Sequence, residues 1–192
     1  MQPILLASGS PRRRELLTQA GIPFTVVPSS AEELRPEEEA HMHPEEVVLE
    51  NARRKALAVS GSRPGEIVLG ADTVVHFRGR IMGKPVSRDD AKEMLTVLSG
   101  QTHQVVTGIC ITDGKKTLSE SVRTDVVFRA LSPEQIDRYL DTGEYADKAG
   151  AYGIQGRGCI LVEKLTGDYF NVVGLPVCRV YEMLERFTEE SR

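Results

Sequence analysis

The segment Ala7–Arg14 combines residue types that suit phosphate binding: two serines, a glycine, a proline and three consecutive arginines. Ser10 is a good N-cap and Pro11 suits the first helical position, so the arginines fall at the start of a helix. Because the helix dipole is positive there, three cations cost stability unless an anion docks beside them. Free N–H groups, hydroxyls and guanidinium groups together could bind a phosphate chain. A solvated basic patch is the alternative, and the three arginines together favour the anion site.

A carboxylate follows one of the predicted buried strands. Ile67–Leu69 is a continuous apolar run of the kind that is buried on both faces of a sheet. Gly70 and Ala71 are small, and Asp72 then stands at the predicted end of the strand. Asp72 could cap a turn, but ligands of α/β proteins gather at the carboxyl ends of strands. The position therefore favours a functional carboxylate.

Two lysines are candidate cations for the same site. Lys84 lies between a glycine and a proline, in a segment that resembles a P-loop only superficially. Three residues rather than four separate Gly79 from Gly83, and Pro85 replaces the Ser or Thr that would bind Mg²⁺, which excludes a Walker A motif. We expect Lys84 to be a fixed cation near Asp72. Lys55 falls within a predicted helix, where it could line the edge of a cleft or belong to a solvated face.

A glycine-rich stretch, residues 146–158, is the other candidate site. It has four glycines between Gly150 and Gly158, but its spacing differs from the dinucleotide fingerprint and no helix is predicted after it. Close glycines let a backbone approach a ligand. Gln155 offers both a donor and an acceptor, which suits the edge of a nucleobase. A mobile surface loop is the alternative, and Asp147 with Lys148 could then be a simple ion pair.

These residues together suit a phosphorylated small ligand. If the protein is catalytic, the expected chemistry is metal-assisted attack of water on phosphorus. Cations would spread the charge of the transition state, and a carboxylate would bind Mg²⁺ or accept the proton of the water.

The elements that position these residues alternate between strands and helices, which predicts an α/β protein. Predicted strands cover residues 4–6, 24–27, 67–69, 159–162 and 170–173, with hairpins over 74–82 and 103–128. Predicted helices follow Ser10, Pro44, Ser87, Ser132 and Pro176, and an acidic surface loop is expected between Glu32 and Glu46.

The bulk properties narrow the function classes. The chain has 192 residues, enough for one large domain or two small lobes, and its net charge of −4 argues against a broad nucleic-acid-binding surface. No run approaches membrane-spanning length and no signal peptide opens the chain, so no membrane association is expected. The three cysteines lack metal or redox spacing. They are interpreted as reduced thiols in or near the core of a cytoplasmic protein.

Five motifs, in order along nearly the whole chain, closely resemble the Maf family of nucleoside triphosphate pyrophosphatases. They are Ala7–Arg13, Gly70–Thr73, Gly83–Pro85, Leu98–His103 and Asp147–Gly156. The resemblance implies an elongated mixed sheet with flanking helices and two lobes around a deep cleft, related to the inosine triphosphatases. It also implies a single domain over residues 1–192 with no separable linker, and a homodimer.

The resemblance implies hydrolysis of a nucleoside triphosphate to the monophosphate and pyrophosphate, with Mg²⁺, Mn²⁺ or Co²⁺. Asp72 would accept the proton and bind metal. Arg12, Lys55 and Lys84 would bind phosphates, and Ser8 and Glu33 would support phosphate or metal.

The form of the glycine-rich stretch resembles the branch that hydrolyses dTTP and UTP, which implies roles in substrate choice. Arg12, Thr73 and Gln155 would then determine specificity. Further substrate-binding residues are expected at Arg13, Asp147 and Lys148. Two alternatives stay open: a 7-methyl-GTP pyrophosphatase of the same family, and a nucleotide-binding regulator of septum formation without turnover.

Overall fold

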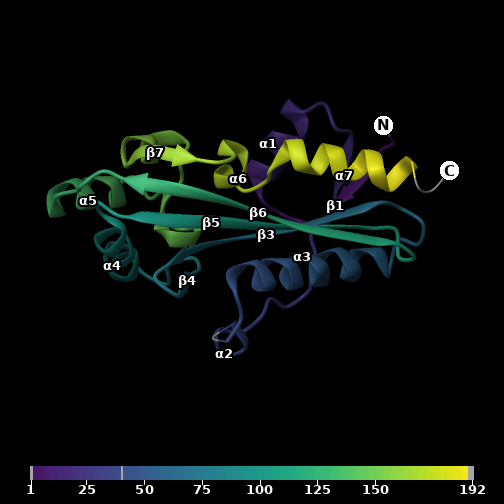
Figure 1. The fold of residues 1–192 in the computed structure, drawn as a ribbon, viewed down its shortest axis with the longest axis horizontal. Helices are drawn as coiled ribbons and strands as arrows, with labels where there is room; N and C mark the ends of the chain where they lie inside the picture. Colours follow the sequence, from purple (N-terminus) through teal and green to yellow (C-terminus); the bar gives the residue numbers. More distant parts are fainter. Residues whose placement is uncertain (1, 40, 190–192) are drawn as a thin grey trace. The chain divides into compact units, whose positions relative to one another are not determined.

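The computed structural model describes residues 2–39 and 41–189. Over these residues the protein is a mixed α/β structure with a seven-stranded sheet and flanking helices (Figure 1), which confirms the predicted fold class. The strands are β1 (Ile4–Leu6), β2 (Phe24–Val26), β3 (Val68–Phe77), β4 (Arg80–Met82), β5 (Thr102–Thr112), β6 (Thr117–Phe128) and β7 (Val162–Thr166). The helices are α1 (Pro11–Gln19), α2 (Pro36–Glu39), α3 (Pro44–Ser60), α4 (Arg88–Leu98), α5 (Pro133–Leu140), α6 (Tyr169–Val173) and α7 (Val177–Glu189), with 3-10 turns η1 (Ala149–Ala151) and η2 (Gly156–Ile160). None of the helices within these ranges is both long enough and apolar enough to cross a membrane.

The chain forms two compact units. Unit 1 contains the residues up to Asp72, Thr107–Val122 and the chain from Gly174 onward. Unit 2 contains Thr73–Val106 and Arg123–Val173. The strands run in the order β2-β1-β3-β5-β6-β7, with β4 paired to β3, and β3, β5 and β6 each contribute residues to both units.

Unit 1 is a helix-covered sheet in which β1 lies between β2 and β3, parallel to both. Helices α3 and α7 cover opposite faces of this sheet (Figure 1). Two glycines let α3 approach unusually closely. A Cβ at Gly70 of β3 would lie 2.3 Å from the carbonyl oxygen of Ala52, and one at Gly108 of β5 would lie 2.3 Å from that of Val48. The helix backbone therefore packs directly on the strands, and side chains of α3 can reach the sheet.

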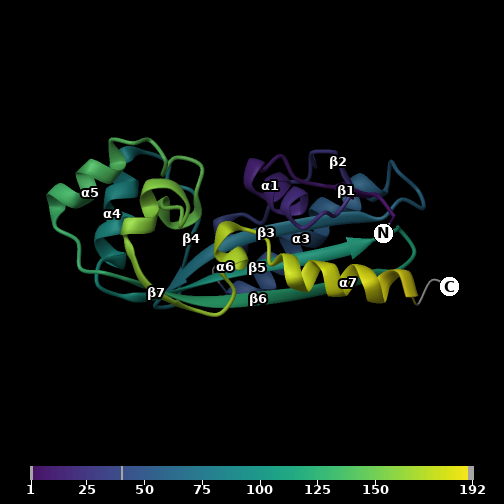
Figure 2. The ribbon, with the colours of Figure 1, turned by 90° about the horizontal axis from the view of Figure 1, so that it is seen from above.

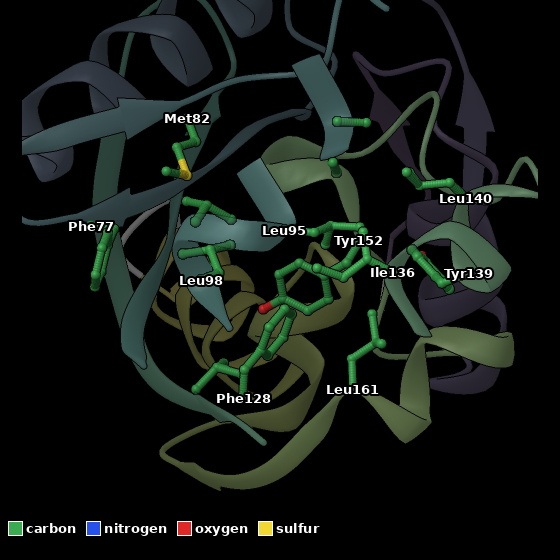
Figure 3. Close-up of a cluster of buried hydrophobic side chains, with 14 of the residues drawn as sticks. Phe77, Met82, Leu95, Leu98, Phe128, Ile136, Tyr139, Leu140, Tyr152 and Leu161 are labelled. Atoms are coloured by element: carbon green, nitrogen blue, oxygen red, sulfur yellow. The ribbon is translucent and has the colours of Figure 1, made fainter. Parts of the chain in front are cut away.

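Unit 2 has its own apolar core, to which α4 and α5, side by side in Figure 2, contribute one flank. Figure 3 shows Phe128, Tyr152 and Leu161 packed with apolar residues of those two helices. Both helices begin as predicted. The Ser87 hydroxyl accepts from the Asp90 N–H, and Ser132 forms a capping box with Gln135.

Two predicted strands are wrong. Residues 170–173 belong to helix α6, because the Asp168 carboxylate accepts from the Phe170 N–H and starts a turn there. Cys159 lies in η2, and β7 begins only at Val162. The backbone of Gly158 lies so close to that of Gly153 that a Cβ at Gly158 would be 1.9 Å from the Gly153 carbonyl oxygen. This close approach is compatible with a turn that needs glycine rather than with a strand.

Three further expectations need correction. Asp72 is not at the end of its strand, because the β-branched residues after it continue β3 to Phe77, where it pairs antiparallel with β4. Of the three cysteines, Cys110 is buried as expected, but Cys159 and Cys178 are exposed. The acidic segment after Glu32 is not a plain loop, since it contains α2.

Candidate functional site

Three charged side chains meet where α3 packs on β3. The ammonium of Lys55 lies 2.7 Å from Oδ1 of Asp72 and 2.6 Å from Oε1 of Glu33. The side chains of Lys55 and Asp72 are only 13% and 11% exposed, whereas Glu33 is 57% exposed. The structure thus brings together three residues that the sequence analysis placed in the site, around one cation that two carboxylates share.

The packing of backbone on backbone explains why this contact forms. Gly70 lies two residues before Asp72 on β3, and its missing side chain lets α3 approach at Ala52 and Ala56. Lys55 lies between those two alanines in sequence and has a side chain long enough to reach along the strand to the carboxylate. The small residues that made Asp72 a candidate therefore also bring its partner within reach.

Sequence reasoning missed Asn51, which is 2% exposed on α3. Its amide nitrogen donates to Oδ2 of Asp72 at 3.1 Å, and its Oδ1 accepts from the N–H of Leu34 at 2.8 Å. The sequence did contain a signal for it. Asn51 lies three and four residues after Val48 and Val47, on the apolar face of the helix, where an amide needs a partner.

Arg13 is buried and contacts the backbone of β3 next to Asp72. Its Nη1 donates to the carbonyl oxygen of Ala71 at 2.8 Å and to the Ser8 hydroxyl at 3.1 Å, and its Nε donates to the carbonyl oxygen of Gly174 at 2.9 Å. Burial lowers the pKa of Arg13, and the charge of Asp72 acts in the opposite direction. These contacts join α1 and the Ser8 turn to the strand that carries Asp72.

The remaining arginines of the segment differ in exposure. Arg12 is half-buried, and Arg14 is exposed on α1. Ser8 is buried, and its hydroxyl also accepts from the N–H of Ser10 at 3.3 Å. The three arginines of the predicted anion site therefore range from the buried Arg13 through the half-buried Arg12 to the exposed Arg14.

Glu39 is a second residue that sequence reasoning missed. Burial raises the pKa of Glu39, and the negative charges of Asp72 and Glu33 act in the same direction. It therefore lies in the electrostatic neighbourhood of the Lys55 cluster. Among the residues that the structure describes, however, no three His, Cys, Asp or Glu side chains are arranged to bind a metal by themselves.

Unit 2 carries the other predicted site residues. Thr73 is half-buried directly after Asp72, and Lys84 is exposed. Lys148 bonds to the carboxylate of Asp147 at 2.8 Å and to the carbonyl oxygen of Glu144. Gln155 is exposed at the N-cap of η2.

The glycine-rich stretch is an ordered turn. The carboxylate of Glu144 accepts from the N–H of Arg157 at 3.1 and 3.0 Å, beside Gly156, whose φ of +60° favours glycine. The aliphatic chain of Lys148 packs against Gly153, where a Cβ would lie 2.6 Å from its Cε. These contacts determine the path of the backbone that presents Gln155.

A buried aromatic cluster supports this stretch from beneath. His103 Nε2 lies 2.8 Å from the hydroxyl of Tyr152, and both rings meet Phe128 edge to face. Burial lowers the pKa of His103 to about 4 and raises that of Tyr152, so both side chains are neutral at pH 7. Tyr152 thereby attaches the stretch to β5.

The model of the Maf family, described as Maf-like protein, matches residues 3–187. The chain belongs to the Maf family. The motifs that carried the resemblance therefore identified the family correctly.

Curated Maf relatives match over almost their full length. A protein of Bacillus cereus strain G9842, named dTTP/UTP pyrophosphatase, is 49% identical over 187 residues, which cover 97% of this chain and 96% of that protein. A Bacillus anthracis protein of the same name is 48% identical over the same shares. Among solved structures, the Ham1 protein of Staphylococcus aureus matches 66% of this chain and 72% of its own, with a TM-score of 0.44 and 15% identity. That likeness is too low to carry a functional argument.

Proposed function

We propose that this Maf protein hydrolyses nucleoside triphosphates, with dTTP and UTP preferred, to the nucleoside monophosphate and pyrophosphate. The observation that carries the proposal is the largely buried ion pair of Lys55 and Asp72, whose ammonium is shared with the more exposed Glu33. The name of the full-length relatives supports the same activity and the pyrimidine preference. Buried ionised groups that are costly for stability are common at catalytic sites.

In the proposed reaction, water attacks phosphorus at the α–β anhydride. The oxygen of the water forms a new bond to phosphorus, the anhydride P–O bond breaks, and monophosphate and pyrophosphate leave. Asp72 accepts the proton that the water loses. Its carboxylate is oriented for this by Lys55 at Oδ1 and Asn51 at Oδ2.

The carboxylates also fit a divalent cation, Mg²⁺, Mn²⁺ or Co²⁺. Asp72 and Glu33 both contact one cation, the Lys55 ammonium. Carboxylate oxygens are hard donors, and Mg²⁺ is usually bound in proteins by one or two carboxylates. Two carboxylates are an incomplete set, so the remaining ligands would come from substrate phosphates and water. When bound, the metal would polarise a phosphoryl oxygen and neutralise developing charge.

Other residues are proposed to bind the rest of the substrate. Arg12, Ser8 and Lys84 would bind phosphates, on the strength of the family resemblance. Arg13 would act mainly through Ser8 and Ala71, to which its guanidinium donates. Specificity is assigned to Arg12, Thr73 and Gln155, and supporting contacts to Asp147 and Lys148, on the strength of the family resemblance.

The test is pyrophosphate release with Mg²⁺ from dTTP, UTP, CTP, GTP, 7-methyl-GTP and ITP. Turnover confined to dTTP and UTP supports the proposal. Preference for 7-methyl-GTP would overturn the pyrimidine assignment within the family. Nucleotide binding without pyrophosphate release would overturn the enzymatic function and favour a regulator of septum formation.

A matched pair of variants tests the carboxylate assignment. Glu33 contacts Lys55, and its neighbour Glu32 is exposed. We expect Glu33→Gln to raise the Mg²⁺ concentration needed for half-maximal activity by about tenfold, in line with loss of one charged ligand. Glu32→Gln should leave that concentration unchanged, and equal effects of the two would contradict the role of Glu33.

A further inference from the structure

The side-chain amide of Asn51 forms hydrogen bonds through both its nitrogen and its oxygen at the proposed site. Its nitrogen donates to Oδ2 of Asp72, 3.1 Å away, and its oxygen accepts from the N–H of Leu34, 2.8 Å away. A carboxylate can only accept and a backbone N–H can only donate, so these partners allow one orientation of the amide. A residue that is 2% exposed and fully engaged in this way has a defined geometry.

Helix α3 holds Asp72 at two points through consecutive turns. Asn51 and Lys55 are four residues apart and therefore lie on one face of the helix. Lys55 takes Oδ1 of Asp72 at 2.7 Å, and Asn51 takes Oδ2. With both oxygens bonded to one rigid helix, the carboxylate plane cannot rotate without breaking a hydrogen bond.

The second contact of Asn51 couples this carboxylate to another segment. Leu34 is the neighbour of Glu33, and the bond from its N–H to Asn51 anchors the backbone from which Glu33 reaches Lys55. Leu34 is itself buried, so its N–H would be costly to leave without a partner. One amide thus bonds both to Asp72 and to the backbone next to Glu33.

We propose that Asn51 is a positioning residue that holds Asp72 and the Glu33 segment in the arrangement that the reaction requires. The inference rests on the proposed pyrophosphatase function. It assigns no contact between Asn51 and substrate, since Asn51 acts through Asp72 and Leu34.

The main test compares two buried asparagines. Asn171 of α6 is 0% exposed and donates to the carbonyl oxygen of Val105 and the hydroxyl of Thr124, within unit 2. Asn51→Ala and Asn171→Ala should both lower the thermal midpoint. At a temperature where both are folded, we expect Asn51→Ala to lose about 100-fold in kcat for dTTP, with KM changed less than about threefold. Asn171→Ala should keep kcat within about threefold.

Hydrogen exchange provides a readout that is independent of turnover. Asn51→Ala should speed exchange at Leu34 and the segment around it, whereas Asn171→Ala should not. If Asn51→Ala kept kcat near the wild-type value, or left exchange at Leu34 unchanged, the inference would be overturned. Absent turnover by the wild-type protein would instead contradict the proposed function.

Asn51→Asp separates the two contacts and covers the case in which Asn51→Ala does not fold. Aspartate has nearly the same shape and can still accept from the Leu34 N–H, but as a carboxylate it cannot donate to Asp72. We expect kcat to fall at least about 30-fold at pH 8 while exchange at Leu34 stays slow. Wild-type kcat in this variant would contradict the positioning of Asp72.

Discussion

The two units differ in whether their most notable buried polar side chains are charged or neutral. In unit 1, Lys55 and Asp72 form a largely buried ion pair beside the buried guanidinium of Arg13. In unit 2, His103 and Tyr152 are buried among aromatic rings, and burial keeps both neutral at pH 7. Each arrangement contains a short hydrogen bond, Lys55 to Asp72 in unit 1 and His103 with Tyr152 in unit 2, but only the first retains charge.

The difference agrees with the roles proposed above, a reactive site in unit 1 and a supporting one in unit 2. A buried ion pair is weak evidence for stability, because desolvation offsets most of the Coulomb attraction. Its retention in unit 1 is better explained by chemistry that needs a carboxylate and a cation. The neutral pair in unit 2 anchors the stretch that carries Gln155, a task for which shape and a hydrogen bond suffice.

Removing the charge of Asp72 should have the largest effect. Asp72→Asn preserves size, so we expect a folded protein by circular dichroism. Pyrophosphate release should fall about 10³-fold or more, about 4 kcal/mol in the activation barrier. Asp89→Asn, an exposed change on α4, is the control and should leave turnover unaltered. If Asp72→Asn retained most of its activity, the charged cluster of unit 1 would not be the reactive site.

Lowering the pH should destabilise the protein through the buried neutral pair of His103 and Tyr152. The pKa of His103 is about 4 in the folded protein, against 6.5 when unfolded, so between these values only the unfolded chain binds the proton. The contribution of His103 to stability is therefore complete above pH 6.5 and is lost as pH falls toward 4, by about 3 kcal/mol.

Urea unfolding at a series of pH values from 7 to 4.5 measures how steeply the free energy of unfolding falls with pH. His103→Gln should flatten this slope, whereas His41→Gln, an exposed control, should not. An unchanged slope in His103→Gln would mean that other groups cause the acid sensitivity.

Close backbone packing in unit 1 should tolerate no added methyl group. In Gly70→Ala the new Cβ would lie 2.3 Å from the Ala52 carbonyl oxygen, so α3 must move away from β3. We expect a loss of about 1–3 kcal/mol in unfolding free energy. Turnover should fall too, because the same shift separates Lys55 and Asn51 from Asp72.

Gly61→Ala is the matched control for that change. Its φ is −58°, and the nearest atom to its Cβ would be 3.5 Å away, so the substitution should change stability by less than about 0.5 kcal/mol. If Gly70→Ala lost stability but kept full turnover in the folded state, the alignment of α3 would not matter for catalysis.

The same contrast explains what sequence could predict. The sequence points to Asp72 because a carboxylate after a buried strand has few structural uses. Lys55 is a candidate cation from its place in a predicted helix, and Glu33 follows only from the resemblance to the family. Asn51 was overlooked because its importance depends on Leu34 and Asp72, which lie 17 and 21 residues away in sequence. Side-chain partners of this kind are set by tertiary packing.

Local patterns failed where tertiary contacts decide between helix and strand. Residues 170–173 are short and apolar, a pattern that does not separate the two. The buried amide of Asn171 donates to Val105 and Thr124, and these long-range bonds stabilise the helical turn. The position of Asp72 in mid-strand was missed for a similar reason, since pairing with β4 extends β3 beyond it.

The smallest expected effect on activity is a change in substrate preference at Gln155, which lies in unit 2. A glutamine amide can accept from N3–H and donate to O4 of uracil. Gln155→Glu keeps an acceptor but cannot donate, so it should repel O4 while accepting from the N4 amino group of cytosine. We expect the ratio of kcat/KM for UTP to that for CTP to fall about tenfold, about 1.4 kcal/mol. Because Gln155 is exposed, stability should not change.

Gln155→Ala distinguishes base reading from a general effect on the stretch. It removes both hydrogen bonds, so kcat/KM for UTP should fall without a gain for CTP. If Gln155→Glu and Gln155→Ala gave the same ratio of kcat/KM for UTP to that for CTP, residue 155 would not distinguish the two bases by hydrogen bonding. The pyrimidine preference would then have to come from Arg12 in unit 1 or from Thr73, the first residue of unit 2.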